Sequence, residues 1–87
     1  MTLSYTLSAL SDKNRQKIIK CLKESELTVS DIAKNLDITS ATLSHHLDVL
    51  KKSGLVSSRR QGRNIFYSLN LSVTDELLIE ITKLIKK

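Results

Sequence analysis

Apolar residues recur at helical spacing through most of the chain, and this pattern predicts two helices in the first 24 residues. The first is a short opening helix, and the second spans about residues 12–24 with its apolar side chains on one side. Ser11 stands directly before the second helix, where its hydroxyl can accept a hydrogen bond from a free backbone N–H. The apolar positions are Leu3, Leu7 and Leu10 in the first helix and Ile18, Ile19 and Leu22 in the second.

A capping box marks the start of a short third helix. Thr28 and Asp31 have the spacing at which each side chain bonds the backbone N–H of the other residue. The helix that follows carries its apolar side chains three and four residues apart, at Val29, Ile32, Ala33 and Leu36.

A fourth helix is expected after a turn of only three residues. Thr39 or Ser40 can cap this helix, which runs to about Ser53, and Gly54 supplies a left-handed stop. Its buried stripe consists of Leu43, Leu47 and Leu50. Two short helices joined by so few residues form a helix-turn-helix.

The helical spacing is interrupted between residues 55 and 69. Residues 55–60 and 64–69 are rich in β-forming side chains, and a turn containing Gly62 closes them into a hairpin. In the second strand Ile65, Tyr67 and Leu69 alternate with Asn64, Phe66 and Ser68.

A last helix resumes the helical spacing. Ser72 and Asp75 have the spacing of another capping box, and the apolar stripe behind them is long for so small a protein. That stripe consists of Val73, Leu77, Leu78, Ile81, Leu84 and Ile85.

These elements predict a mainly α-helical winged helix-turn-helix in the order α-α-α-α-β-β-α, with residues 1–87 forming one domain. A domain of this size buries only roughly 60% of the surface that its unfolded chain exposes, so a partner subunit is expected. Segments 1–11 and 72–87 carry the apolar faces that are suited to homodimer formation. The candidate interface residues are Leu3, Leu7, Leu77, Leu78, Ile81, Leu84 and Ile85.

The net charge of +5 is concentrated in the helix-turn-helix and the hairpin. Residues 39–70 hold five basic side chains and one acidic side chain, which gives +4 for that segment. A basic surface also suits anionic membranes or acidic proteins, but here it lies beside a helix of a size that fits the major groove of duplex DNA. We therefore expect binding to double-stranded DNA.

The side chains on the outward face of the fourth helix are short and mostly polar, so its first turns can approach base edges closely. A solvated surface without function is the alternative for this face, and a soluble hairpin is the alternative for the three arginines. His46 falls near the apolar stripe, where we expect a half-buried, hydrogen-bonded histidine. The candidate DNA-binding residues are Thr39, Ser40, Ala41, Thr42, Ser44, His45 and Lys52 in the helix and Arg59, Arg60, Gln61 and Arg63 in the hairpin.

Other classes of protein have little support. No apolar run exceeds three residues, so neither a secretory signal nor a membrane span is predicted. Cys21 is the only cysteine and is expected to be a packed hydrophobe in a protein of the reducing cytoplasm. Paired acid and base groups, a glycine-rich phosphate loop and a metal cluster are all missing from the sequence, so no enzyme activity is expected.

The motifs as a group resemble the ArsR (ArsR/SmtB) family of bacterial winged-helix repressors. The matching segments are Ile38-Thr39-Ser40-Ala41-Thr42-Leu43-Ser44-His45-His46-Leu47, Gly54-Leu55-Val56, Arg59-Arg60-Gln61-Gly62-Arg63 and Tyr67-Ser68-Leu69, together with Leu10-Ser11-Asp12, Arg15, Ile18 and Leu22 upstream. The resemblance implies a homodimer joined by the first and last helices, a palindromic operator, and repression that a signal relieves. It also implies base and phosphate contacts at Ser44 and His45.

The sequence departs from the metal-sensing members of this family. They carry a Glu-Leu-Cys-Val-Cys-Asp box, whereas this chain has Glu26-Leu27-Thr28-Val29-Ser30-Asp31, in which hydroxyls replace both thiolates. Residues 71–87 contain no histidine for the other familiar metal site. The chain therefore resembles the short autorepressors of the family, which a protein partner or their own concentration controls. No metal at either familiar site and no cofactor are expected.

A DNA-binding repressor is thus the leading hypothesis. The alternative is a protein-docking module, because winged helices also serve as interaction domains and the last apolar stripe can receive a foreign helix. Binding to RNA or single strands is disfavoured, since only Tyr5, Phe66 and Tyr67 are aromatic and could stack on bases.

Overall fold

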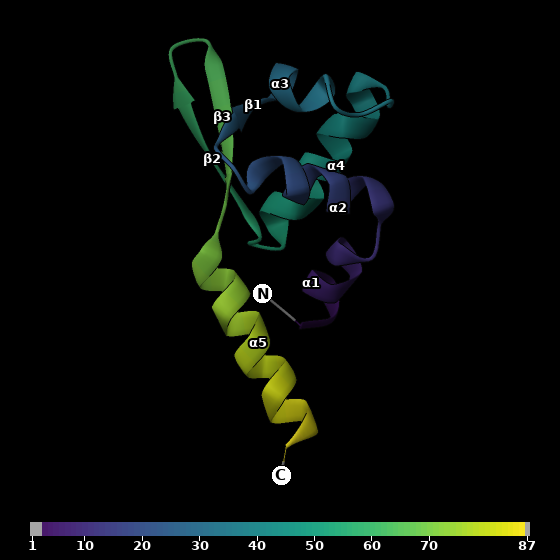
Figure 1. Ribbon diagram of the computed structural model, residues 1–87, viewed down its shortest axis with the longest axis vertical. Helices are drawn as coiled ribbons and strands as arrows, with labels where there is room; N and C mark the ends of the chain where they lie inside the picture. The colour runs from purple at the N-terminus through teal and green to yellow at the C-terminus, as the bar shows by residue number, and fades with distance from the viewer. Residues whose placement is uncertain (1–2, 87) are drawn as a thin grey trace.

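The computed structural model describes residues 3–86, which form five helices and three strands (Figure 1). The winged helix-turn-helix predicted from the sequence is confirmed, with one additional short strand before the helix-turn-helix. The elements in chain order are α1 (Leu3–Leu10), α2 (Lys13–Leu22), β1 (Leu27–Thr28), α3 (Val29–Ala33), α4 (Ser40–Lys52), β2 (Val56–Gln61), β3 (Asn64–Leu69) and α5 (Leu71–Ile85).

The strands form an antiparallel sheet in the order β1-β3-β2. Phe66 in β3 lies opposite Arg59 in β2 on one side and opposite Thr28 in β1 on the other. The sequence did not predict β1, because a strand of two residues is too short to show an alternating pattern. Its pairing with β3 ties the hairpin to α3, which begins at the next residue.

Asp12, and not Ser11 as predicted, caps α2. The backbone N–H of Arg15 donates to Asp12 Oδ2 at 3.0 Å. The Ser11 hydroxyl instead donates to the carbonyl of Ser8 at 2.7 Å and so closes the end of α1. The helix therefore begins at Lys13, one residue later than expected.

The predicted start of the helix-turn-helix is confirmed. Asp31 N–H donates to Thr28 Oγ1 and Thr28 N–H donates to Asp31 Oδ2, both at 3.2 Å, so the capping box is complete. Thr39 caps α4, and its side chain accepts from Thr42 N–H at 3.2 Å. Gly54 follows α4 with a φ of 83°, a conformation that favours glycine and ends the helix.

The predicted capping box of the last helix is wrong. Asn70 occupies the cap position, and its side chain makes no capping hydrogen bond. The backbone N–H of Asn70 donates to the carbonyl of Leu55 at 2.9 Å, which fixes the chain where β3 ends, so α5 begins directly afterwards. Ser72 and Asp75 consequently lie inside the helix.

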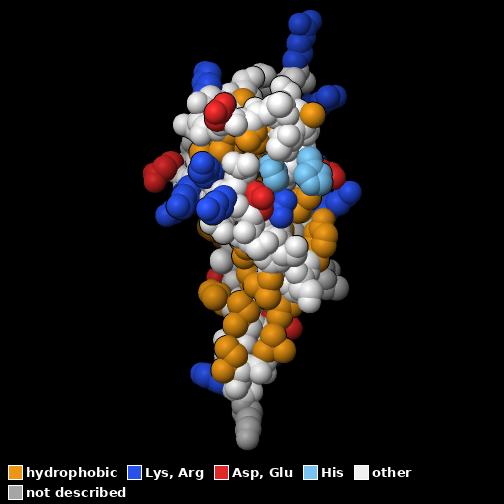
Figure 2. All heavy atoms as spheres, turned by 90° about the vertical axis from the view of Figure 1, so that its right-hand side faces the viewer, with side chains coloured by type: hydrophobic (Ala, Val, Ile, Leu, Met, Phe, Trp, Pro, Cys, Tyr) orange, Lys and Arg blue, Asp and Glu red, His pale blue; other side chains and the backbone are white. Residues whose placement is uncertain are grey.

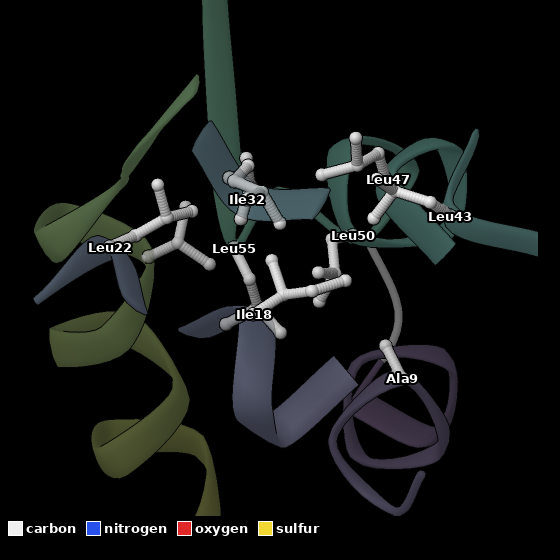
Figure 3. Packing of buried hydrophobic residues seen from close by; sticks show 10 residues of the cluster. Ala9, Ile18, Leu22, Ile32, Leu43, Leu47, Leu50 and Leu55 are labelled. Carbon is white, nitrogen blue, oxygen red and sulfur yellow. The ribbon is translucent and has the colours of Figure 1, made fainter. Parts of the chain in front are cut away.

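The hydrophobic core lies between α1, α2, α3, α4 and the base of the hairpin (Figure 3). Helix α5 contributes only Val73 to the buried cluster and extends away from the body, which makes the described part of the molecule 48 Å long and 20–24 Å wide (Figure 1). The buried apolar residues are Ala9, Ile18, Leu22, Ile32, Leu43, Leu47, Leu50, Leu55, Val56 and Val73.

Candidate nucleic-acid interface

Helix α4 is fixed by one buried face and presents the opposite face to solvent. Leu43, Leu47 and Leu50 are at most 2% exposed and anchor the helix in the core. The side chains predicted to meet DNA from its first two turns lie on the exposed surface, and all of these are small except one imidazole. They are Ser40, Ala41, Thr42, Ser44 and His45.

Thr39 is exposed, but its hydroxyl is already engaged. It accepts from the backbone of Thr42 as the helix cap and donates to Thr42 Oγ1 at 2.9 Å. These two bonds order the first turn of α4, where the exposed side chains begin. The structure therefore gives Thr39 a role in holding the helix start.

At the other end of α4, Lys52 pairs with Asp48 within the helix. Its Nζ lies 3.0 Å from Asp48 Oδ2, and this hydrogen bond raises the pKa of Lys52. Both side chains are more than half exposed, so the ion pair is weak and can exchange with a phosphate. Lys51 makes no ion pair with any residue in the range 3–86.

The hairpin of β2 and β3 (residues 56–69) is called the wing below. Its tip presents two cations to solvent. Gly62 turns the chain with a φ of 63°, and a Cβ added there would meet nothing within 4 Å, so backbone conformation alone requires glycine. Arg60 and Arg63 are exposed, and neither side chain bonds another of the described residues. Gln61 is also exposed, but its Oε1 accepts from Arg59 at 2.7 Å.

Arg59 differs from the other two arginines of the wing. Its Nε donates to Glu26 Oε2 at 3.1 Å, its Nη2 donates to the other carboxylate oxygen, and its guanidinium carbon lies 4.7 Å from the ring centroid of Phe66. The hydrogen bonds from Arg59 lower the pKa of Glu26. Glu26 was not among the predicted site residues, because β1, which places it beside the wing, has no sequence signal of its own.

His46 is hydrogen-bonded as expected, but it is buried on the inner side of α4 and not half-buried. The residue is 7% exposed, and its Nδ1 lies 3.1 Å from Arg15 Nη1. Asp12 Oδ2 lies 3.8 Å from its Nε2. Burial lowers the pKa of His46, and the nearby Asp12 carboxylate opposes this shift. His46 therefore has a structural role, whereas His45 faces solvent.

Among residues 3–86, no three His, Cys, Asp or Glu side chains come close enough together to hold a metal ion. Thr28, at the position of a thiolate in the metal-sensing box, uses its hydroxyl to cap α3. Cys21 is half-buried and unpaired within the same range. No helix in this part of the chain combines the length and the apolar character that crossing a bilayer requires.

Apolar side chains gather along α5 and the adjoining part of α1, while most Lys and Arg side chains lie in the half of the molecule with the wing and α4 (Figure 2). Leu3 and Leu77 are half-buried and help to line a hollow of about 250 Å³, and Ile81 is also half-buried. The remaining candidate interface residues are more exposed, with Leu7 at 42%, Leu78 at 59%, Leu84 at 72% and Ile85 at 77%.

Comparison with known proteins identifies related regulators. Residues 12–58 match the family described as "Bacterial regulatory protein, arsR family". The transcriptional repressor SdpR of Bacillus subtilis (strain 168) is 35% identical over 85 residues, which cover 98% of this chain and 94% of that protein. Two further relatives are the cadmium resistance transcriptional regulatory proteins CadC of Listeria innocua and Lactococcus lactis subsp. lactis. Both are longer, and the chain matches 56% of the length of each.

Solved structures share the fold over almost the whole chain. An ArsR-like transcriptional regulator from Rhodococcus sp. RHA1 has a TM-score of 0.86 at 27% identity, over 94% of this chain and 77% of that chain. The homodimeric winged helix-turn-helix DNA-binding domain of Mb0332 from Mycobacterium bovis has a TM-score of 0.76 at 28% identity, over 92% and 76%. The chain belongs to the ArsR family of bacterial regulatory proteins.

Proposed function

We propose that this protein is a transcriptional repressor that binds a specific double-stranded DNA sequence as a homodimer. The observation that carries the proposal is that α4 exposes a face of short side chains beside the tip of the wing. At that tip, Arg60 and Arg63 make no bond with the other described residues. A helix of this size enters the major groove, and a basic hairpin beside it reaches the adjacent backbone or minor groove.

The roles of the side chains follow from their length and charge. Ser40, Ala41, Thr42 and Ser44 are short enough for close approach to base edges, and His45 can donate to a guanine acceptor or to a phosphate oxygen. Phosphate contacts fix the register of the protein on the duplex. We assign these contacts to Lys52, Arg60, Gln61 and Arg63.

The apolar surface of α1 and α5 supports the homodimer. Leu84 and Ile85 are more than 70% exposed in a single chain, and so large an apolar surface favours association. The related Mb0332 domain is homodimeric. A two-fold dimer would offer two copies of α4 to one face of the duplex and would read a palindromic operator with half-sites roughly 10 bp apart.

Control by a protein partner or by the protein's own concentration fits the site better than metal sensing. Thr28 and Ser30 stand where the metal-sensing members carry thiolates, and hydroxyls are poor ligands for soft metals. We further propose that residues 1–87 act as one cytoplasmic DNA-binding domain without a cofactor or enzyme activity. The docking-module alternative is not favoured, because SdpR is a transcriptional repressor.

Selection from a pool of random duplexes tests the proposed function. The purified chain should enrich one inverted repeat with two equal half-sites. The double variant Arg60→Gln, Arg63→Gln should lose most of its affinity for that repeat while its circular dichroism stays unchanged. Failure to enrich any sequence, or enrichment of a site without two-fold symmetry, would refute the proposal.

A further inference from the structure

Glu26 and Arg59 lie on the same face of the sheet, at opposite edges. Arg59 in β2 pairs with Phe66 in β3, and Phe66 pairs with Thr28 in β1, so these three residues form a row across all three strands. Glu26 stands two residues before Thr28, on the same side, because alternate residues of an extended chain share a face. A contact between Glu26 and Arg59 therefore spans the full width of the sheet.

The guanidinium of Arg59 is engaged on every nitrogen. Nε and Nη2 form a two-pronged contact with the Glu26 carboxylate, and Nη1 donates to Gln61 Oε1 at 2.7 Å. The planar group also lies over Phe66, where a cation gains from the negative face of the ring. Binding a phosphate through Arg59 would require giving up these contacts.

We propose that Glu26 and Arg59 form a clasp that positions the wing relative to the helix-turn-helix, and that Arg59 does not bind DNA directly. This inference rests on the proposed function. Glu26 precedes β1, and β1 runs straight into α3, so the clasp joins the wing to the first helix of the helix-turn-helix. With only two residues in β1, few backbone hydrogen bonds make that connection on their own.

The clasp and a direct phosphate contact predict opposite effects of removing the Glu26 charge. If Glu26 positions the wing, Glu26→Gln loosens the wing and weakens DNA binding. If Glu26 only shields a phosphate-binding Arg59, the same change frees a cation, tightens DNA binding and makes it more dependent on salt. Glu24→Gln is the matched control, since it removes the same charge nearby from an exposed side chain without an ion pair among the described residues.

The experiment measures operator affinity by fluorescence anisotropy between 50 and 200 mM salt. We expect Glu26→Gln and Arg59→Gln each to weaken binding by about tenfold in a dimer with two wings, with the double variant no weaker than either single variant. Their salt dependence should match that of the native protein. Arg60→Gln should instead make the fall of log affinity with log salt less steep, by about 0.9 per lost phosphate contact.

A charge reversal tests positioning by rescue. The paired change Glu26→Arg, Arg59→Glu keeps the net charge and restores an ion pair across the sheet. The clasp predicts tighter binding by the double reversal than by either single reversal. A direct phosphate contact predicts that the double reversal binds with an affinity between those of the two single reversals.

Hydrogen exchange in the free protein separates this inference from the proposed function. Glu26→Gln should speed amide exchange in β2 and β3 without DNA present, and Glu24→Gln should leave it unchanged. If the native protein binds no duplex, the proposed function fails while this readout still tests the clasp. Unchanged exchange, or operator binding by Glu26→Gln that is equal to or tighter than native, would overturn the clasp.

Discussion

The Arg15 side chain joins α1 to the buried face of α4 through His46. Arg15 Nη1 lies 3.1 Å from His46 Nδ1, and Arg15 Nε donates to the carbonyl of Ala9 at 2.7 Å. Arginine has no acceptor, so this contact requires His46 to be neutral with Nδ1 as the acceptor. The proposed dimer helix and the proposed DNA-reading helix therefore share one positively charged link.

This arrangement makes stability depend on pH. Burial lowers the pKa of His46 from its ordinary value of 6.5, so the unfolded chain takes up a proton more readily than the folded protein. The free energy of unfolding should be highest above pH 6.5 and should fall as the pH drops from there through the folded pKa. Denaturant unfolding at fixed protein concentration over this range measures the effect.

Two histidine variants provide the control for that measurement. His46→Gln should remove the loss of stability that begins near pH 6.5, whereas the neighbouring, exposed His45→Gln should keep it. Asp12, whose pKa is lowered mainly by the hydrogen bond from Arg15 N–H, titrates at lower pH and does not interfere. An identical pH profile in the native protein and His46→Gln would contradict this account.

Loss of the Arg15 link should destabilise the fold. Arg15→Ala leaves the Ala9 carbonyl and His46 Nδ1 without this donor, and we expect a loss of about 1–3 kcal/mol in the free energy of unfolding. Lys17→Ala, on the exposed side of the same helix, should change it by less than about 0.5 kcal/mol. Chemical denaturation checks both values, and equal effects of the two variants would argue against the link.

The apolar end of α5 should be required for the dimer. The double variant Leu84→Ser, Ile85→Ser should sediment as a monomer at concentrations where the native chain is dimeric, because both side chains are exposed in one subunit. Ile79→Ser makes the same kind of change on the other side of α5, where 54% of the residue is exposed, and should leave the dimer intact. A native chain that sediments as a monomer would contradict the proposed assembly.

The wing turn should tolerate only residues that accept a left-handed backbone. Gly62→Ala keeps a φ of 63° only at a cost of roughly 1–2 kcal/mol, although nothing obstructs the added methyl group. Gly62→Asn should cost less, since asparagine visits this conformation more readily. Operator affinity should therefore decrease in the order glycine, asparagine, alanine, and equal affinities would show that the turn conformation does not matter.

The sequence was sufficient for the elements that carry their own local signals. Thr39 and Gly54 mark the two ends of α4, because capping and left-handed geometry each depend on a single residue. Thr28 and Asp31 form the predicted capping box. The β-forming pattern predicted β3 with its observed bounds and β2 to within one residue at each end. Helix spacing also placed His46 near the apolar stripe, although the structure buries it more fully than the half-burial expected.

Features that depend on distant residues were not predictable. The strand β1 exists through its pairing with β3, and the partnership of Glu26 with Arg59 depends on that pairing. The sequence grouped Arg59 with Arg60 and Arg63 by composition, although the structure engages only Arg59. The predicted start of α5 was wrong for the same reason. A hydrogen bond from Asn70 N–H to the carbonyl of the distant Leu55 fixes where this helix begins.

A change in half-site spacing tests most directly that two copies of α4 reach successive major grooves on one face of the duplex. In the operator found by selection, an insertion of 5 bp between the half-sites turns them to opposite faces of the DNA, since one helical turn is roughly 10 bp. We predict one dimer per native operator and a loss of at least about a hundredfold in affinity on the 5 bp insertion. Equal affinity for both duplexes, with one chain bound at each half-site, would contradict the account.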